Sequence, residues 1–291
     1  MKITIYIPTK NRVALLKKAV KSVLEQTYEN WELIVVNDAS TDGTKEYLDT
    51  LAASNHKIKA IHHRESHGAC VSRNDAIFSA SGEYITGLDD DDEFTNDRLE
   101  KFISNWDFDE RIIALCAYKN LVIDGKKIPA ANTKAIYITR EDLLYKNTVG
   151  NQIFIKTEKL RQIGGFDEDF KMWQDYSCWY KLLSAGGIIK KIPFATYNWD
   201  HSDRDDRITQ FNKDKTIATY NLFVRKFALN FRNANILKFT LVDYHLRQNN
   251  WAFYFEILLG TLFDRRAIEK INNEFLKPKV YNVFKRLKLI K

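Results

Sequence analysis

Apolar and polar positions along the first 110 residues switch repeatedly between a strand period and a helix period. Short β-rich apolar runs alternate with longer stretches in which apolar residues recur every three or four positions. This alternation is typical of βαβ units around a mostly parallel sheet, so we predict an α/β fold. The predicted strands are 3–7, 31–36, 58–62 and 83–88, and the predicted helices are 12–26, 44–53, 69–80 and 96–106.

Beyond residue 111 the alternation loosens and hairpin signals appear. Asp124-Gly125 predicts a hairpin turn, and Thr139 with Asp142 predicts a capping box that opens a short helix. We therefore expect a mixed central sheet in the second half of the fold. Its predicted strands are 112–118, 152–156, 188–192 and 194–199, and its predicted helices, each ended by a Gly-Gly pair, are 157–163 and 175–185.

The final third is predicted to be helical and aromatic. Its most apolar stretch, 251–263, contains Glu256 and is shorter than the roughly 20 residues that span a bilayer, so we predict no membrane-crossing helix. Residues 265–291 carry the whole net charge of +7, because basic and acidic side chains balance over the first 264 residues. Apolar residues at helical spacing accompany this charge, which favours an amphipathic segment on an anionic membrane surface. An ordinary surface helix with a solvated basic face is the alternative.

Composition limits the class of protein. A hydrophobic content of 45% is enough for a sizeable core. The cysteines, Cys70, Cys116 and Cys178, are odd in number and widely spaced, which argues against a disulfide framework and favours a reducing cytosol. A strand pattern begins directly after Lys2 without a signal-peptide core, so we expect a cytoplasmic protein. Nucleic acid is not an expected partner, because the basic excess is confined to the tail.

Candidate chemistry begins with four consecutive carboxylates, Asp89 to Asp92, directly after the predicted strand 83–88. Two like charges about 4 Å apart repel by roughly 4 kcal/mol at a protein surface, so crowded carboxylates favour a divalent cation such as Mn²⁺ or Mg²⁺. A solvated acidic face is the alternative, but such faces rarely follow a β-rich strand directly.

Polar clusters also follow the other predicted parallel strands. Residues 8–12 come after the first strand and Asn37-Asp38 after the second, while Arg73-Asn74 lie in the third helix. Ligands in open parallel sheets bind beyond the carboxyl ends of the strands. We therefore expect these clusters and the acid run to meet at one edge of the sheet.

These segments together resemble the inverting glycosyltransferases of family 2, which have the GT-A fold. The resemblance covers about residues 3–190, in the order and spacing of that family, and rests on 5–12, 34–44, 68–74, 80–85 and 88–92. It implies a GT-A catalytic domain at 1–205 with a mixed central sheet, followed by a helical, basic C-terminal extension at 206–291. Within the domain it implies a nucleotide-sugar-binding half at 1–110 and an acceptor-binding half at 111–205.

The resemblance also implies roles for individual residues. The nucleotide-sugar would contact Pro8, Thr9, Asn11, Arg12, Asp38, Arg73, Asp89 and Asp90. Within this set Asp38 would bond a uracil-type base, and Arg73 would reach the base or a phosphate; a salt bridge to Asp75 or Asp38 is the alternative for Arg73. Asp91 would bind the metal ion as part of a DxD pair with Asp89, although the residues leave the choice among Asp90, Asp91 and Asp92 open.

The second half carries Gly164-Gly165-Phe166-Asp167 and then Trp173-Gln174-Asp175, where the family usually has an acidic pair. Gln174 replaces the first acid. Asp175 matches the second and would be the general base, with helix capping as the alternative. Trp173 and Gln174 are candidate acceptor contacts, although a Trp here is as typical of a core. His201 is a candidate metal ligand by the same resemblance.

We therefore expect a metal-dependent hexosyltransferase. It would take a UDP-sugar donor and a glycan or polyprenyl-diphosphate-linked acceptor, in bacterial lipopolysaccharide, O-antigen or capsule synthesis, at or near the cytoplasmic face of the inner membrane. One alternative is a sugar nucleotidyltransferase, but it would need a glycine-rich loop where residues 8–12 contain no glycine. A nucleotide-sugar or glycan binding protein without turnover is another, which Gln174 keeps open.

The basic tail leads to a first prediction. The full chain should float with vesicles that contain anionic lipid, and a chain lacking residues 265–291 should not, because nearby basic residues contribute roughly 1 kcal/mol each to binding such a surface. Neutral vesicles are the control. Equal flotation of the two chains with anionic vesicles would contradict the membrane assignment.

Overall fold

The computed structural model describes residues 1–106, 109–202, 213–241, 251–261 and 264–273. The chain forms two compact units. The first comprises residues 1–143 and 147–208, and the second comprises 144–146 and 209–291. All the predicted catalytic and nucleotide-sugar contacts fall in the first unit, whereas the assignment of separate roles to 1–205 and 206–291 stays a prediction.

One mixed sheet of ten strands organises the first unit, as far as the structure describes it. Its order is β3-β2-β1-β4-β9-β6-β10-β5, with β7 on β6 and β8 on β10. The neighbours in β3-β2-β1-β4 are parallel, β9 is antiparallel to β4 and β6, and β6 is parallel to β10. The predicted α/β class with a mixed sheet is confirmed. The strands are β1 (Ile3–Thr9), β2 (Trp31–Asn37), β3 (Ile58–His62), β4 (Tyr84–Gly87), β5 (Glu93–Phe94), β6 (Ile112–Ile123), β7 (Lys126–Ile128), β8 (Ile136–Ile138), β9 (Phe154–Lys156) and β10 (Ile188–Asp200).

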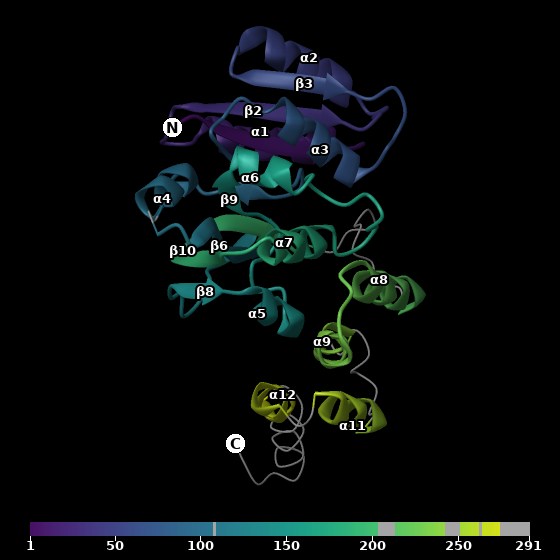
Figure 1. The fold of residues 1–291 in the computed structure, drawn as a ribbon. Helices are drawn as coiled ribbons and strands as arrows, with labels where there is room; N and C mark the ends of the chain where they lie inside the picture. The colour runs from purple at the N-terminus through teal and green to yellow at the C-terminus, as the bar shows by residue number, and fades with distance from the viewer. Residues whose placement is uncertain (107–108, 203–212, 242–250, 262–263, 274–291) are drawn as a thin grey trace, which may run out of the picture. The chain divides into compact units, whose positions relative to one another are not determined.

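Helices cover both faces of the sheet (Figure 1). Alternate residues of β1 and β2 pack with apolar residues of α1 (Val13–Leu24), α2 (Thr44–Ser54) and α4 (Arg98–Ser104) in one core. The other face carries α3 (Ala69–Ser79), α6 (Thr157–Gln162) and α7 (Gln174–Ser184), where Phe166 contacts both Tyr6 of β1 and Trp179 of α7. Because both faces are covered, every residue of β1 is buried.

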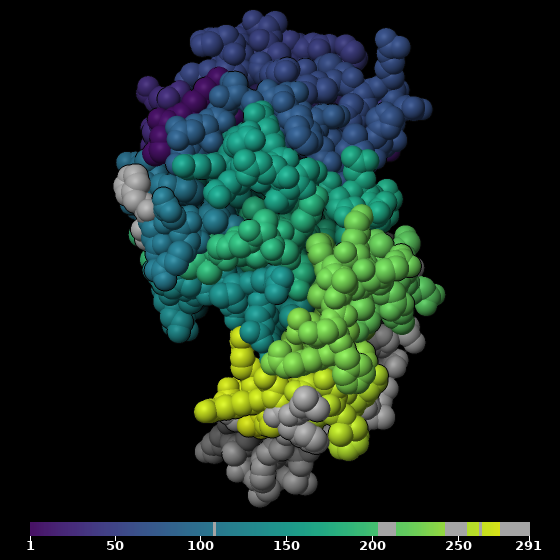
Figure 2. Space-filling view, viewed as in Figure 1, coloured from purple at the N-terminus to yellow at the C-terminus, as the bar shows by residue number. Residues whose placement is uncertain are grey.

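The two predicted halves share one body. Strand β9 joins them, since it pairs with β4 of the first half and β6 of the second. In the space-filling view the blue surface of the first half passes directly into the teal surface of the second (Figure 2). A site built from both halves therefore needs no movement of separate domains.

The second half differs from the prediction in its strands. The two short strands predicted at 188–192 and 194–199 are one strand, β10, whose pairing with β6 shifts register between Lys191 and Ala195. Pro193 separates the two predicted strands. It lies within this register shift, where its missing N–H interrupts no regular ladder of hydrogen bonds. Strand β6 runs on to Ile123, and β5 and β8 were not predicted because two or three residues make no period.

The second unit is helical in its described residues. Its helices are α8 (Lys213–Lys226), α9 (Phe231–Leu237), α11 (Trp251–Gly260) and α12 (Arg265–Ile271). The Asp264 side chain caps α12 by accepting hydrogen bonds from the amides of Arg266 and Ala267. Across the described ranges, no helix has both the length and the apolar character that crossing a bilayer requires. The predicted amphipathic segment is 265–291, and its part from residue 274 onward lies outside the described residues.

Close packing between β1 and β4 requires a glycine. Gly87 pairs with Tyr6, and a Cβ at position 87 would lie 2.4 Å from the Tyr6 ring and 2.0 Å from Gln152 Oε1. The Tyr6 hydroxyl donates a hydrogen bond to this Gln152 oxygen at 3.2 Å. Gly87 thus lets two buried polar side chains approach β4 immediately before the acid run.

Replacing Gly87 by alanine should destabilise the protein. Overpacked cores lose typically 1–3 kcal/mol of unfolding free energy, and we expect a loss of about 2 kcal/mol because ring and amide must both shift. The midpoint of urea unfolding measures the effect. Ala53→Ser, which adds one atom at an exposed position, is the control; equal midpoints for the two variants would show that the space at Gly87 is not needed.

Candidate active site

The acid run forms a turn directly after β4. The turn is closed by the Asp92 amide, which donates to the Asp89 carbonyl at 3.1 Å. The four carboxylates face different surroundings: the side chains of Asp89 and Asp91 are 22% and 20% exposed, whereas Asp90 and Asp92 are buried. The run is therefore neither a solvated face nor a single cluster.

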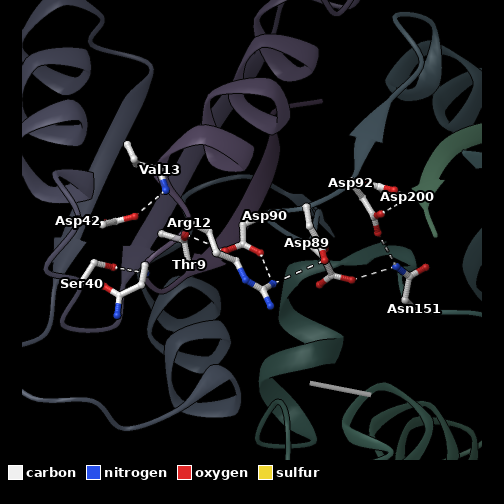
Figure 3. Close-up of polar contacts among 12 residues, drawn as sticks. Thr9, Arg12, Val13, Ser40, Asp42, Asp89, Asp90, Asp92, Asn151 and Asp200 are labelled. Carbon is white, nitrogen blue, oxygen red and sulfur yellow. Dashed lines mark hydrogen bonds and ion pairs between the residues drawn. The ribbon is translucent and has the colours of Figure 1, made fainter. Parts of the chain in front are cut away.

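Asp90 joins the acid run to the loop that follows β1. It accepts hydrogen bonds from Thr9 Oγ1 at 2.8 Å and from Arg12 Nη1 at 3.1 Å (Figure 3). Burial raises the pKa of Asp90 to about 6, although the nearby Arg12 guanidinium opposes this shift. These contacts confirm that the polar segments after the first and fourth predicted strands meet at one edge of the sheet.

Asp89 faces the opposite direction, toward the second half of the domain. It forms an ion pair with Arg73 Nη2 at 3.1 Å and accepts hydrogen bonds from Asn151 and Gln152 at 2.9 and 3.1 Å. Arg73 also donates to Gln174 Oε1 at 2.7 Å. The salt bridge considered for Arg73 does form, but with Asp89 in place of Asp75 or Asp38. One arginine thus connects helix α3, the acid run and the start of α7.

Asp92 and Asp91 differ in their surroundings. Asp92 accepts from the Asp200 amide at 2.8 Å and from Asn151 at 3.4 Å (Figure 3). Burial, together with the negative charges of Asp89 and Asp91, raises the pKa of Asp92 well above its usual range. Asp91 lies 3.6 Å from Arg12 Nη1. Asp92 therefore belongs to the interior, and Asp91 to the edge of the sheet.

Carboxylate oxygens suit Mn²⁺ and Mg²⁺, which prefer hard ligands. Asp89 and Asp91 are the two members of the run whose side chains stay partly exposed, so these are the carboxylates that a divalent ion could reach. In the described part of the chain no three His, Cys, Asp or Glu side chains are arranged to hold a metal together. His201 is exposed, and its ring packs on Trp199 with centroids 4.6 Å apart.

Asp38 organises the loop between β3 and α3. Its Oδ1 accepts from His63 Nδ1 at 2.9 Å and from the His67 amide at 2.8 Å, and its Oδ2 accepts from Ser66 Oγ at 2.6 Å and from the Gly68 amide at 3.0 Å. Burial acts to raise the pKa of Asp38, but these hydrogen bonds hold it at about 2. A carboxylate accepts about four hydrogen bonds, so a uracil N–H would have to replace one of these donors.

Asn11 connects two of the edge loops. It has a left-handed backbone, with φ 53°, and its side-chain oxygen accepts from the Thr41 amide at 2.7 Å. Its own amide donates to Ser40 Oγ at 2.8 Å. Pro8 lies within β1, one residue before Thr9. The predicted nucleotide segment is thus held by the loop after β2.

Asp175 lies in the first turn of α7 and is partly buried. The N-cap position belongs to Trp173, whose φ is 59°, so Asp175 is not the N-cap residue. Burial raises the pKa of Asp175, and Asn147 Nδ2 donates to its carboxylate at 3.1 Å. Trp173 packs near Tyr176, with ring centroids 5.5 Å apart. Gln174 stands where the family usually has an acid. Because Arg73 donates a hydrogen bond to Gln174, the guanidinium contacts the residue directly before Asp175.

The sequence analysis did not predict a role for several residues of this network. Asn147, Asn151, Gln152 and Tyr197 all contact the acids or Asp175, and His63 bridges Asp38 and Asp75. Three histidines lie near the end of the third predicted strand, His62, His63 and His67, but their spacing matches no motif that indicates chemistry. The other four residues match no sequence motif. Their segments meet the acids only because β9 pairs with β4 and β6, and β10 pairs with β6.

Comparison with known families gives a direct match. The family model described as "Glycosyl transferase family 2" matches residues 4–162. This span covers more than half of the chain and includes β1, the acid run and β9.

Curated proteins similar to this chain include bacterial glycosyltransferases. The putative colanic acid biosynthesis glycosyl transferase WcaA of Escherichia coli is 32% identical over 88% of this chain and 92% of its own length. The putative teichuronic acid biosynthesis glycosyltransferase TuaG of Bacillus subtilis is 29% identical over 63% of this chain and 73% of its own length.

Solved structures show the same fold. TarS of S. aureus in complex with UDP-GlcNAc aligns with a TM-score of 0.67 at 18% identity, over 89% of this chain and 79% of that one. The mannosyltransferase PcManGT of Pyrobaculum calidifontis, in complex with GDP-Man and Mn²⁺, aligns with a TM-score of 0.62 at 16% identity, over 99% and 81%. These likenesses confirm the predicted GT-A fold. Together with the family match and the relationship to WcaA, they lead to one identification: the chain belongs to glycosyl transferase family 2 and is a glycosyltransferase.

Proposed function

We propose that this enzyme is a metal-dependent inverting glycosyltransferase that moves a hexose or N-acetylhexosamine from a UDP-sugar to a glycan or polyprenyl-diphosphate-linked glycan. The observation that carries the proposal is the contact chain from Asp89 through Arg73 to Gln174, which joins the acid run to the helix turn that holds Asp175. A donor bound at the acids and an acceptor at α7 would then react at a shared boundary.

Asp175 acts as the general base in this proposal. It takes the proton of an acceptor hydroxyl while that oxygen forms a bond to the anomeric carbon. The bond from the anomeric carbon to the diphosphate breaks, and the diphosphate leaves with the electron pair. One displacement inverts the configuration and needs no covalent intermediate. The hydrogen bond from Asn147 orients the carboxylate for this role.

Asp89 and Asp91 would hold the Mn²⁺ or Mg²⁺ ion. When bound, this ion supplies positive charge that stabilises the departing diphosphate. Arg73 holds Asp89 in place through an ion pair at 3.1 Å, and Arg12, 3.6 Å from Asp91, adds a cation beside the same edge. Asp90 accepts hydrogen bonds from Thr9 and Arg12. We propose that it positions these two residues for the donor and does not contact the donor itself. His201 would join the metal ligands only after its ring leaves Trp199.

The nucleotide would lie along the loops after β1, β2 and β3. Residues 8–12 would form one side of its site, and Asp38 with the loop that it holds would form the other. A base that reaches Asp38 would replace one of its four hydrogen bonds, with the Ser66 hydroxyl as the donor that can rotate away. This exchange would let Asp38 both shape the loop and read the base.

The acceptor and the biological setting are proposals from the relatives. WcaA and TuaG are named for colanic acid and teichuronic acid biosynthesis, which supports a role in bacterial surface polysaccharide synthesis. A polyprenyl-linked acceptor would lie at the cytoplasmic face of the membrane, where residues 265–291 would dock. Trp173 and Gln174, next to Asp175, would contact the acceptor.

Replacing Asp175 by asparagine should lower kcat by at least about 100-fold, the usual contribution of a general base, and leave UDP affinity unchanged. A base must be deprotonated to act, and the pKa of Asp175 is raised. As the pH is lowered, the activity of the unaltered enzyme should therefore fall at a pH above about 4, the ordinary carboxyl pKa. The variant should lack this loss of activity at low pH. Nucleoside diphosphate release measured against pH tests both expectations.

Asp169→Asn, an exposed change in the segment before α7, is the matched control and should behave like the unaltered enzyme. Transfer that survives Asp175→Asn would point to another base. Donor binding without any turnover by the unaltered protein, across acceptor arrays, would instead favour a binding protein.

Metal removal gives a second expectation for this function. UDP affinity measured by calorimetry should fall by about tenfold or more in EDTA, because two carboxylates then face the diphosphate without a cation between them. Asp91→Ala should reproduce the loss of the Mn²⁺ effect, whereas Asp49→Ala, at an exposed site on α2, should not. UDP-glucose, UDP-galactose, UDP-N-acetylglucosamine and GDP-mannose should then be compared for Mn²⁺-dependent release. Equal UDP affinity with and without EDTA would contradict the role of the metal.

A further inference from the structure

A small cavity beside strands β6 and β10 is lined by three cationic side chains. Arg98, Lys119 and Lys191 line it together with Asn151, Gln152 and Tyr197, and its volume is about 30 Å³. Lys119 and Tyr197 are register partners on β6 and β10, so the cavity lies over the pairing of these two strands. None of the three cations is part of the catalytic network described above.

Within the part of the chain that the structure describes, two of these cations lack a counter-ion. Arg98 is 1% exposed; its guanidinium is stacked on Phe94 and Phe102 and donates to Thr196 Oγ1, but its Nε is buried without a hydrogen-bond partner in the ranges that the structure describes. Burial lowers the pKa of Arg98 to about 10. Lys119 lies 3.6 Å from the centroid of the Trp199 ring and, among the described residues, forms no ion pair. A buried cation without a counter-ion is costly, so this cavity favours a negative ligand.

Among the described residues, no neighbouring acid forms an ion pair with Arg98 or Lys119. Asp89 is paired with Arg73 at 3.1 Å, and Asp92 accepts hydrogen bonds from the Asp200 amide at 2.8 Å and from Asn151 at 3.4 Å. Burial lowers the pKa of Lys119, whereas the nearby acids, Asp175 first among them, favour its charged form without forming an ion pair with it in the described residues. Lys191 donates a hydrogen bond to the Thr148 carbonyl at 2.7 Å. Arg98 and Lys119 therefore line the cavity as cations without an ion-pair partner in the described part of the chain.

The cavity is connected to the proposed base by two hydrogen bonds. The amide of Gly150, which lines the cavity, donates to Asn147 Oδ1 at 3.1 Å, and Asn147 Nδ2 donates to Asp175 at 3.1 Å. An acceptor whose hydroxyl reaches Asp175 therefore has this cavity close to the same sugar. The size is also selective: a water needs about 10–15 Å³, so 30 Å³ admits about two oxygen-sized atoms, as in a carboxylate.

We propose that the cavity lined by Arg98, Lys119 and Lys191 binds a negatively charged group of the acceptor, with the size of the carboxylate of a sugar acid. The proposal rests on the proposed function, because it assigns the charge of the acceptor that Asp175 activates. Lys119 and Lys191 would donate charge-assisted hydrogen bonds to the anion, and Arg98 would supply fixed positive charge from the protein interior. The site would make the enzyme select acidic over neutral acceptors.

Binding of simple sugars to the full chain, saturated with UDP and Mn²⁺, tests the proposal. Methyl β-glucuronide should bind about tenfold more tightly than methyl β-glucoside in saturation-transfer NMR titrations, as expected for charge-assisted hydrogen bonds. Glucose 6-phosphate distinguishes the two sources of negative charge. A preference for it over the glucuronide would keep the anion site and identify the group as a phosphate.

Lys119→Met should abolish the preference for the charged sugar and leave UDP affinity unchanged, and Lys191→Met carries the same expectation if the first variant does not fold. Lys127→Met, on the exposed hairpin strand β7, is the matched control and should keep the preference. Equal binding of charged and neutral sugars, binding of neither, or a preference that survives both lysine changes would overturn the proposal. Failure of the unaltered protein to bind UDP would instead overturn the proposed function, so the two failures can be told apart.

Discussion

The ion pair between Arg73 and Asp89 is the interaction on which the rest of the site depends. Taking both charges out of water is costly, and the cost is offset only where the remaining hydrogen-bonding groups are satisfied. Here Gln174 accepts from the guanidinium, while Asn151 and Gln152 donate to the carboxylate. These partners come from α3, the acid run, the segment before β9 and α7. Through these hydrogen bonds a charge pair of the first half contacts the second half of the domain.

The acid run illustrates how a fold accommodates like charges. Its four carboxylates are directed to different partners: Asp89 to Arg73, Asp90 to Thr9 and Arg12, Asp92 to the interior beside β10, and Asp91 to the partly exposed edge. Only two of them are left with appreciable exposure. The sequence of four aspartates thus contains two buried acids and two partly exposed ones, and only the partly exposed pair fits our proposal of a ligand contact.

Positive charge is distributed by the same principle. Arg12 and Arg73 are paired with the acids, whereas Arg98 and Lys119 are packed on aromatic rings without ion pairs in the described residues. Rings stabilise a cation without cancelling its charge. Near Asp175, burial and the charge of Asp89 act to raise the pKa of the carboxyl, whereas the charges of Arg73 and Lys119 act to lower it.

Local pattern was sufficient for the class of fold, the βαβ order, the hairpin at Asp124-Gly125, the capping pair Thr139 and Asp142, and the edge of the sheet where Thr9, Arg12 and Asp90 meet. These features depend on neighbouring residues or on the single rule that parallel strands end at one edge. Tertiary structure alone decided the partner of Arg73, the saturation of Asp38 by the loop 63–68, and the cavity around Lys119. Each of these depends on which strands pair and in what register, as the irregular pairing of β10 with β6 shows. Register places side chains from distant segments within a few ångströms, and no local pattern of apolar and polar residues encodes that distance.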